Sequence, residues 1–282
     1  MEKSANHDVG MSVRWVRPSH DLSHYVSGFV ERVDSDVFGQ SLELPVGTPF
    51  LHAVLGADYA FARESTFAPM PALSLWGFVE RCRVTRPAGR LHAFVAALTY
   101  RGAALLAPPT ETRGIRLDLS SVLGDEAQRL MQQLHMAGSF RERCGLMESF
   151  MRERLANQRA DRGQCVYDVA DAIVAGRLRG SVAAIAARLD LHERTLRHQF
   201  RHYLAASPKM LLRVARLNRV IRAIHPTPWG DAWREDVAAE FFDHAHFHQE
   251  FVSLTGLSPR QFIQAKRLSG DPLVYCLANW PS

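Results

Sequence analysis

Three histidines at alternating positions, His244, His246 and His248, are the residues whose type and spacing most suggest metal chemistry. Imidazole nitrogens are common ligands of zinc. On a helix, however, side chains two residues apart point about 200° away from one another, so the three rings cannot converge on one ion. His192-Glu193 with His198 is not the HExxH zinc motif, because the second histidine comes too late. We therefore expect no metal site.

Arrangements typical of catalysis do not stand out either. The sequence shows no GxSxG motif, no glycine-rich phosphate loop and no paired carboxylates. His52 and His92 stand alone in apolar segments, which favours core or pocket positions. A metal-dependent cupin enzyme would need a clustered His-x-His and a Glu, which residues 40–100 lack. We expect no enzymatic activity and no cofactor, and an enzymatic N-terminal barrel is the least favoured alternative.

Basic residues at helical spacing indicate a different chemistry. Leu196 and Phe200 are four residues apart and share one face of a predicted helix. The other faces carry four basic side chains: Arg194, Arg197, His198 and Arg201. Such a surface suits DNA, because guanidinium groups pair with guanine edges and with phosphates. We expect the first three to read bases and Arg201 to contact phosphate.

The flanking residues predict the elements that position this helix. Apolar residues at helical spacing indicate a preceding helix over residues 182–189, which is interrupted by Asp190-Leu191-His192. Ser207-Pro208 begins the next helix, with Ser as N-cap and Pro at the first helical position. Two short helices joined by a tight turn, the second with a cationic outer face, describe a helix-turn-helix.

The unit recurs 51 positions downstream without gaps, so one supersecondary unit occurs twice in the C-terminal third. The coinciding positions are Leu196/Phe247, Phe200/Phe251, Ser207-Pro208/Ser258-Pro259 and Arg216-Leu217/Arg267-Leu268. The matching DNA contacts of the second copy are His244, His248 and Gln249. A solvated surface is the competing interpretation there, because that helix contains no Lys or Arg. Between the copies, a helix over 208–224 would be about 25 Å long, and could hold two reading helices about one DNA turn (~34 Å) apart.

These segments resemble the C-terminal domain of the AraC/XylS family of transcription regulators. The segments that carry the resemblance are 181–189, 194–200, 207–209 and 213–217 in the first copy, and 241–247 and 254–259 in the second. The resemblance implies a domain with two helix-turn-helix units that bind double-stranded DNA. Ala205 and Glu240 replace glycines that the family usually carries. Asp236 and Glu240 also fall on core positions of the repeat, so the first copy is the safer DNA reader.

The distribution of charge agrees with a phosphate-binding surface in the C-terminal third. Residues 175–268 contain 15 Lys and Arg against 8 Asp and Glu, a net +7, and the remainder of the chain is −2. No apolar run approaches the length of a membrane span. Cys82, Cys144, Cys165 and Cys276 are scattered without a CxxC, which is typical of reduced thiols in a bacterial-type cytoplasm.

Residues 10–120 differ in character, with short apolar runs broken by Pro and Gly that predict a small antiparallel barrel or sandwich. The predicted strands lie within 44–55, 59–62, 72–79, 83–84 and 91–99. We expect Pro18–Phe29 to form a short lead-in helix and Tyr100–Leu106 to form a loop. The resemblance implies that this region is the sensor half of the regulator.

Two helices follow the strands. One is predicted over 124–137, and Ser139 with Glu142 forms a capping box that begins the other. The second helix carries an apolar stripe: Leu146, Met147, Phe150, Met151 and Leu155. We favour packing of this stripe on its own barrel over the dimer face that the resemblance implies. The polar segment Asn157–Gln164 is the best candidate for a linker.

We therefore predict an α+β protein with a β-rich sensor domain (1–122), a helical pair that could dimerise and link (123–160), and an all-α DNA-binding domain (165–282). The predicted function is sequence-specific transcription regulation in the cytoplasm, with a small-molecule effector in the barrel, a homodimer and RNA polymerase as candidate partners, and no membrane. The alternative is a ligand sensor that acts mainly through protein partners and binds DNA weakly. The sequence does not decide between activator and repressor.

Overall fold

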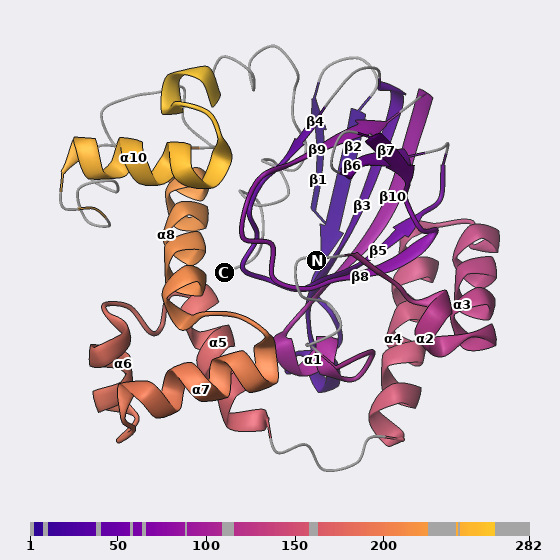
Figure 1. The fold of residues 1–282 in the computed structure, drawn as a ribbon. Helices are drawn as coiled ribbons and strands as arrows, with labels where there is room; N and C mark the ends of the chain where they lie inside the picture. Colours follow the sequence, from indigo (N-terminus) through magenta and orange to yellow (C-terminus); the bar gives the residue numbers. More distant parts are fainter. Residues whose placement is uncertain are drawn as a thin grey trace.

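The computed structural model is described for residues 3–7, 11–37, 41–56, 59–63, 66–87, 89–108, 116–157, 163–224, 241 and 243–262. Two antiparallel sheets with flanking helices form the N-terminal part, and helices form the C-terminal part (Figure 1). The predicted α+β class is confirmed. None of the described helices is long and apolar enough to cross a membrane.

The larger sheet contains seven strands, ordered β1 (Lys3–His7), β2 (Met11–Val16), β3 (Val26–Val37), β10 (Gly89–Leu98), β5 (Phe50–Val54), β8 (Leu73–Trp76) and β11 (Arg116–Asp118). The smaller sheet contains four, ordered β4 (Ser41–Glu43), β9 (Arg83–Pro87), β6 (Tyr59–Arg63) and β7 (Thr66–Pro69). A buried ion pair between Arg116 and Glu43 joins the two sheets. The strands expected near residues 50, 60, 75, 85 and 95 are therefore present, and β1 to β4, β7 and β11 are additional.

Side chains alternate between the two faces of the larger sheet, as strand geometry requires. Leu51 and Phe94 belong to a core that the sheet shares with α3 (Asp125–Met136) and α4 (Phe140–Ala156). The short helix α2 (Ser120–Leu123) leads into this pair (Figure 1). Three residues of the α4 stripe are buried in this core: Met147, Phe150 and Met151. The stripe therefore packs on its own sheet, as we favoured.

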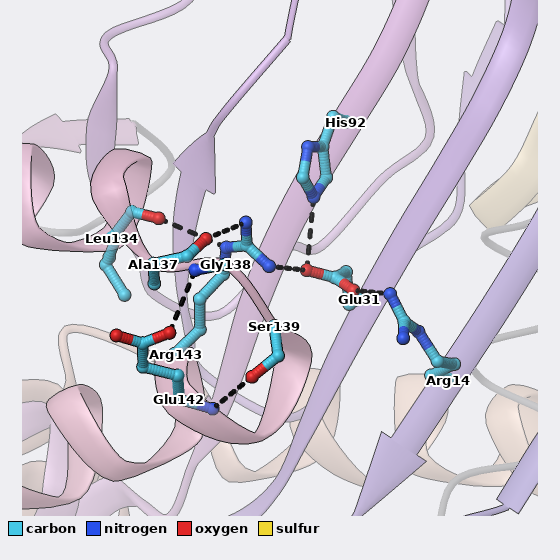
Figure 2. Close-up of polar contacts among 9 residues, drawn as sticks. All are labelled: Arg14, Glu31, His92, Leu134, Ala137, Gly138, Ser139, Glu142 and Arg143. Carbon is cyan, nitrogen blue, oxygen red and sulfur yellow. Dashed lines mark hydrogen bonds and ion pairs between the residues drawn. The ribbon is translucent and has the colours of Figure 1, made fainter.

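A buried carboxylate fastens α4 to the sheet (Figure 2). The Glu31 side chain, which has no solvent exposure, accepts hydrogen bonds from Arg143 at 2.8 Å and Arg14 at 2.5 Å, and lies 3.1 Å from His92 Nε2. Arg143 also donates to the carbonyl oxygens of Leu134 and Ala137 at the end of α3. Burial alone would raise the pKa of Glu31, but the hydrogen bond from His92 and the surrounding positive charges outweigh it and lower that pKa.

Two local predictions were wrong. Within Pro18–Phe29, only His20–Leu22 is helical, as a 3₁₀ turn (η1), because strand β3 already begins at Val26. The expected loop over Tyr100–Leu106 instead contains helix α1 (Tyr100–Ala104), whose first turn is capped by the Thr99 hydroxyl. Gly102 permits this helix to pack closely, since a Cβ there would lie 1.9 Å from the carbonyl oxygen of Tyr25.

The C-terminal part is helical, as predicted. Its described helices are α5 (Gln164–Val174), α6 (Val182–Arg188), α7 (Glu193–Leu204), α8 (Pro208–Ile224) and α10 (His244–Thr255). One apolar core joins all five helices and includes Leu44, Val46, Phe78 and Tyr100 of the N-terminal part. The candidate first helix of the second copy, with Asp236 and Glu240, and most of the linker Asn157–Gln164 lie outside the described residues.

Candidate nucleic-acid interface

Helices α6 and α7 form the first helix-turn-helix (Figure 1). The Ser181 hydroxyl accepts a hydrogen bond from Ala184 N at 3.1 Å and begins α6. Asp190 has φ +53° and reverses the chain between the two helices. Leu196, Phe200 and Leu204 are buried on the inner face of α7. The predicted break at residues 190–192 and the predicted start of α7 at Glu193 are confirmed, and α6 ends at Arg188, one residue before its predicted end.

The four basic residues predicted on α7 lie on its outer face and are all exposed: Arg194, Arg197, His198 and Arg201. Arg197 is held by an ion pair with Glu193, one turn earlier. The His198 ring stacks on His202 with 6.2 Å between centroids. This face therefore combines positive charge with partly ordered side chains, which is the chemistry that base edges and phosphates require.

The end of α7 shows why the family prefers glycine at position 205. Ala205 has φ +49°, in the left-handed region that favours glycine. The matching residue 51 positions later, Gly256, ends α10 in the same region with φ +75°. Both copies therefore use one left-handed residue to turn into the next helix, and the first copy does so with a methyl group that adds strain.

Helix α10 is the second candidate reading helix. The Asp243 side chain accepts a hydrogen bond from His246 N at 2.7 Å and caps the helix. Phe247 and Phe251 are buried at the positions of Leu196 and Phe200. The predicted contact residues on its outer face are exposed: His244, His248 and Gln249. His246 instead lies 5.6 Å from the Phe241 ring, so the three histidines do not share a face.

The helix between the two copies, α8, has the predicted boundaries and 17 residues. Arg213 of α8 donates through Nε to both carboxylate oxygens of Glu250 at 3.0 and 2.8 Å, and through Nη2 to the Ser253 hydroxyl at 3.2 Å. A two-pronged guanidinium contact of this kind fixes orientation as well as distance. It sets the angle between α8 and the second reading helix. Sequence reasoning missed this pair.

Sequence reasoning also missed the polar contacts between the N-terminal part and the helical domain. Arg101 donates to both oxygens of Asp168 on α5, at 2.7 and 2.5 Å. Tyr100 N donates to Asp171 at 3.0 Å. Burial raises the pKa of Asp171 to about 7, although that hydrogen bond opposes the shift. Cys82 N donates to the carbonyl oxygen of Leu254 at the end of α10.

The comparisons with known proteins agree with this geometry in the helical domain. A family model described as a helix-turn-helix domain matches residues 185–265, which include both reading helices. No curated protein sequence matches the chain.

Among solved structures, ToxT from Vibrio cholerae O395 superposes with a TM-score of 0.47 at 9% identity, over 84% of this chain and 97% of that one. ToxT from Vibrio cholerae strain SCE256, described as bound to an unsaturated fatty acid, gives a TM-score of 0.46 at 13% identity, over 83% and 94% of the two chains. Likenesses this distant decide neither fold nor function.

The matched model, the capped helices α6 and α10 and the cationic outer face of α7 point to one conclusion. Residues 185–265 are a helix-turn-helix domain of the AraC type, and the resemblance to AraC/XylS-family transcription regulators is confirmed for this part of the chain.

Proposed function

We propose that this protein is a sequence-specific DNA-binding transcription regulator. The observation that carries the proposal is the outer face of α7, where Arg194, Arg197, His198 and Arg201 are exposed above a fully apolar inner face. Arg194, Arg197 and His198 would read base edges in the major groove, and Arg201 would contact phosphate. In the second copy, His244, His248 and Gln249 would make the weaker contacts.

The salt dependence of binding tests this function. Promoter fragments bound by the protein should be selected from its own genome and titrated between about 50 and 200 mM salt. Because several guanidinium groups would displace counterions, affinity should fall by about 10³-fold or more over this range for six or more phosphate contacts. A scrambled fragment should bind more weakly at every salt concentration. Equal affinity for both fragments, with little salt dependence, would contradict the proposal.

We propose that an effector would bind between the two sheets, at the buried polar cluster around His52 and Arg116. His52 lies on the face of β5 opposite the helical pair, near Trp76 and the Arg116–Glu43 ion pair. Arg116 lies 4.0 Å above the Trp76 ring. Burial, with the charges of Arg116 and Arg32, lowers the pKa of His52 to about 4, so its ring is neutral at pH 7. An effector would raise the melting temperature and alter DNA affinity in parallel.

A sensor that works mainly through protein partners is the second candidate. It is favoured by α10, which contains no Lys or Arg and exposes Val252. This function predicts weak binding to every fragment and retention of a partner protein by the wild type. A homodimer, contact with RNA polymerase and a cytoplasmic location belong to the first proposal, and sedimentation of the wild type at micromolar concentration tests the dimer.

A further inference from the structure

A buried amide in the middle of α8 needs an explanation beyond helix packing. Asn218 is 5% exposed, and its neighbours Leu217, Val220 and Ile221 are buried apolar residues of the same helix. Burying a primary amide costs free energy unless its hydrogen bonds are replaced. Its partners therefore indicate what this position does.

Both partners are backbone groups of the N-terminal part. Asn218 Nδ2 donates to the carbonyl oxygen of Pro45 at 2.8 Å, and Asn218 Oδ1 accepts from Gly47 N at 3.3 Å. The Tyr100 hydroxyl donates to the carbonyl oxygen of Gly47 at 2.8 Å. A Cβ at Gly47 would lie 3.2 Å from Val174, so the segment fits closely against the helices. The amide thus fixes where α8 sits along the segment between β4 and β5.

Helix α8 also contacts the second copy, so the position of α8 affects the position of α10. Arg213, little more than one turn before Asn218, holds α10 through Glu250 and Ser253. The N-terminal part also contacts α10 directly, through the hydrogen bond from Cys82 N to Leu254 O at 3.1 Å. Among the described residues, the hydrogen bonds and ion pairs that join the N-terminal part to the helical domain fall on α5, α8 and the end of α10, and none on α6 or α7.

We propose that Asn218 is a positioning residue that couples the N-terminal sheets to the second reading helix, so that these sheets set the orientation of α10 relative to α7. This inference rests on the proposed DNA-binding function. Loss of the amide would leave α7 and its contacts intact and would release α10 from the geometry needed for the second half-site. Asn218 would then determine the preference for a complete site without contacting DNA itself.

Binding of full-length Asn218→Ala to two DNA fragments tests the coupling. One fragment carries the complete selected site and the other only the half read by α7. The wild type should prefer the complete site, and Asn218→Ala should lose that preference about tenfold while its affinity for the half-site stays within about twofold. Val220→Ala is the matched control, because it shortens a buried side chain of the same helix and leaves the hydrogen bonds of Asn218 to Pro45 and Gly47 in place. It should keep the wild-type preference.

Hydrogen exchange of the same proteins without DNA provides an independent readout. In Asn218→Ala, exchange should rise in residues 44–47 and in α10 and stay unchanged in α7. An equal loss of affinity for both fragments, an unchanged preference, or the same effect in Val220→Ala would overturn the assignment. A wild type that binds neither fragment specifically would overturn the proposed function instead, and the exchange pattern would still decide whether Asn218 couples the sheets to α10.

Discussion

The two helix-turn-helix units share a framework and differ in the surfaces that they present. Phe200 of α7 and Phe251 of α10 are both buried, and Ala205 and Gly256 turn the chain in the same left-handed conformation. The outer face of α7 carries three arginines, whereas that of α10 carries histidines and a glutamine. The apolar spacing that builds the unit therefore does not dictate which polar groups the unit presents to DNA.

The two units are also attached differently to the N-terminal part. On the side of the first unit, the N-terminal part contacts α5. Asp168 accepts a hydrogen bond from Arg101, and Asp171 accepts one from Tyr100 N. On the side of the second unit, the N-terminal part contacts α8, where the neutral amide of Asn218 binds backbone groups, and it also contacts the end of α10. Burial raises the pKa of Asp171, whereas the Asn218 amide does not titrate. Attachment on the side of the first unit should therefore depend on pH, and attachment of the second should not.

The largest expected effect tests whether the two cores are equivalent. Phe200→Ala and Phe251→Ala each remove a fully buried ring, and each should lower the free energy of unfolding by about 3–5 kcal/mol. Chemical denaturation measures this loss. Val252→Ala, at an exposed position of α10, is the control and should cost little. If Phe251→Ala costs under about 1 kcal/mol, the second unit is not a packed copy of the first.

A smaller effect comes from Asp171. Its pKa is raised to about 7 from an ordinary value of 3.8, so the folded state holds a proton that the unfolded state has lost. Stability contributed by that proton is present below about pH 4 and is lost as pH rises towards 7, with a slope of at most about 1.4 kcal/mol per pH unit. The neighbouring groups that face this carboxyl are Tyr100, Arg101, Asp168 and Arg177.

Asp171→Asn keeps the acceptor for Tyr100 N and removes the titrating group. The variant should be more stable than the wild type at pH 8, and the difference should disappear near pH 4. Thermal unfolding of both proteins across this range provides the measurement. Identical pH profiles for the two proteins would show that burial does not raise the pKa of Asp171 in the folded state.

The smallest effect concerns the turn after α7. Ala205→Gly relieves about 1–2 kcal/mol of strain at φ +49°, and the greater unfolded-state entropy of glycine offsets about 0.4–1 kcal/mol of it, so the variant should be more stable by up to about 1 kcal/mol. Gly256→Ala, the reciprocal change, should destabilise it by at least as much. A loss of stability in Ala205→Gly would mean that the methyl group makes contacts that outweigh the strain.

The sequence predicted the parts of the site that local pattern controls. The spacing of Leu196 and Phe200, the break at Asp190 and the Ser-Pro at the start of α8 each act within a few residues, and the helix boundaries follow from them. Contacts between distant segments leave no such pattern. Asn218 meets Pro45, and Arg143 meets Glu31, only after folding. Helix α1 was missed because Gly102 lowers its helix propensity, and the close packing against Tyr25 that requires this glycine leaves no local pattern.

A hydroxyl-radical footprint of the full-length wild type on a site selected from random DNA tests most directly whether α7 and α10 bind DNA with unequal base preference. If α7 and α10 both bind DNA, two protected patches should lie about one helical turn (~10 bp) apart on one face of the duplex. The selected bases should be strongly preferred under the first patch, where α7 binds, and weakly under the second. A single patch, two patches with equal base preference, or failure to enrich any site would contradict the account.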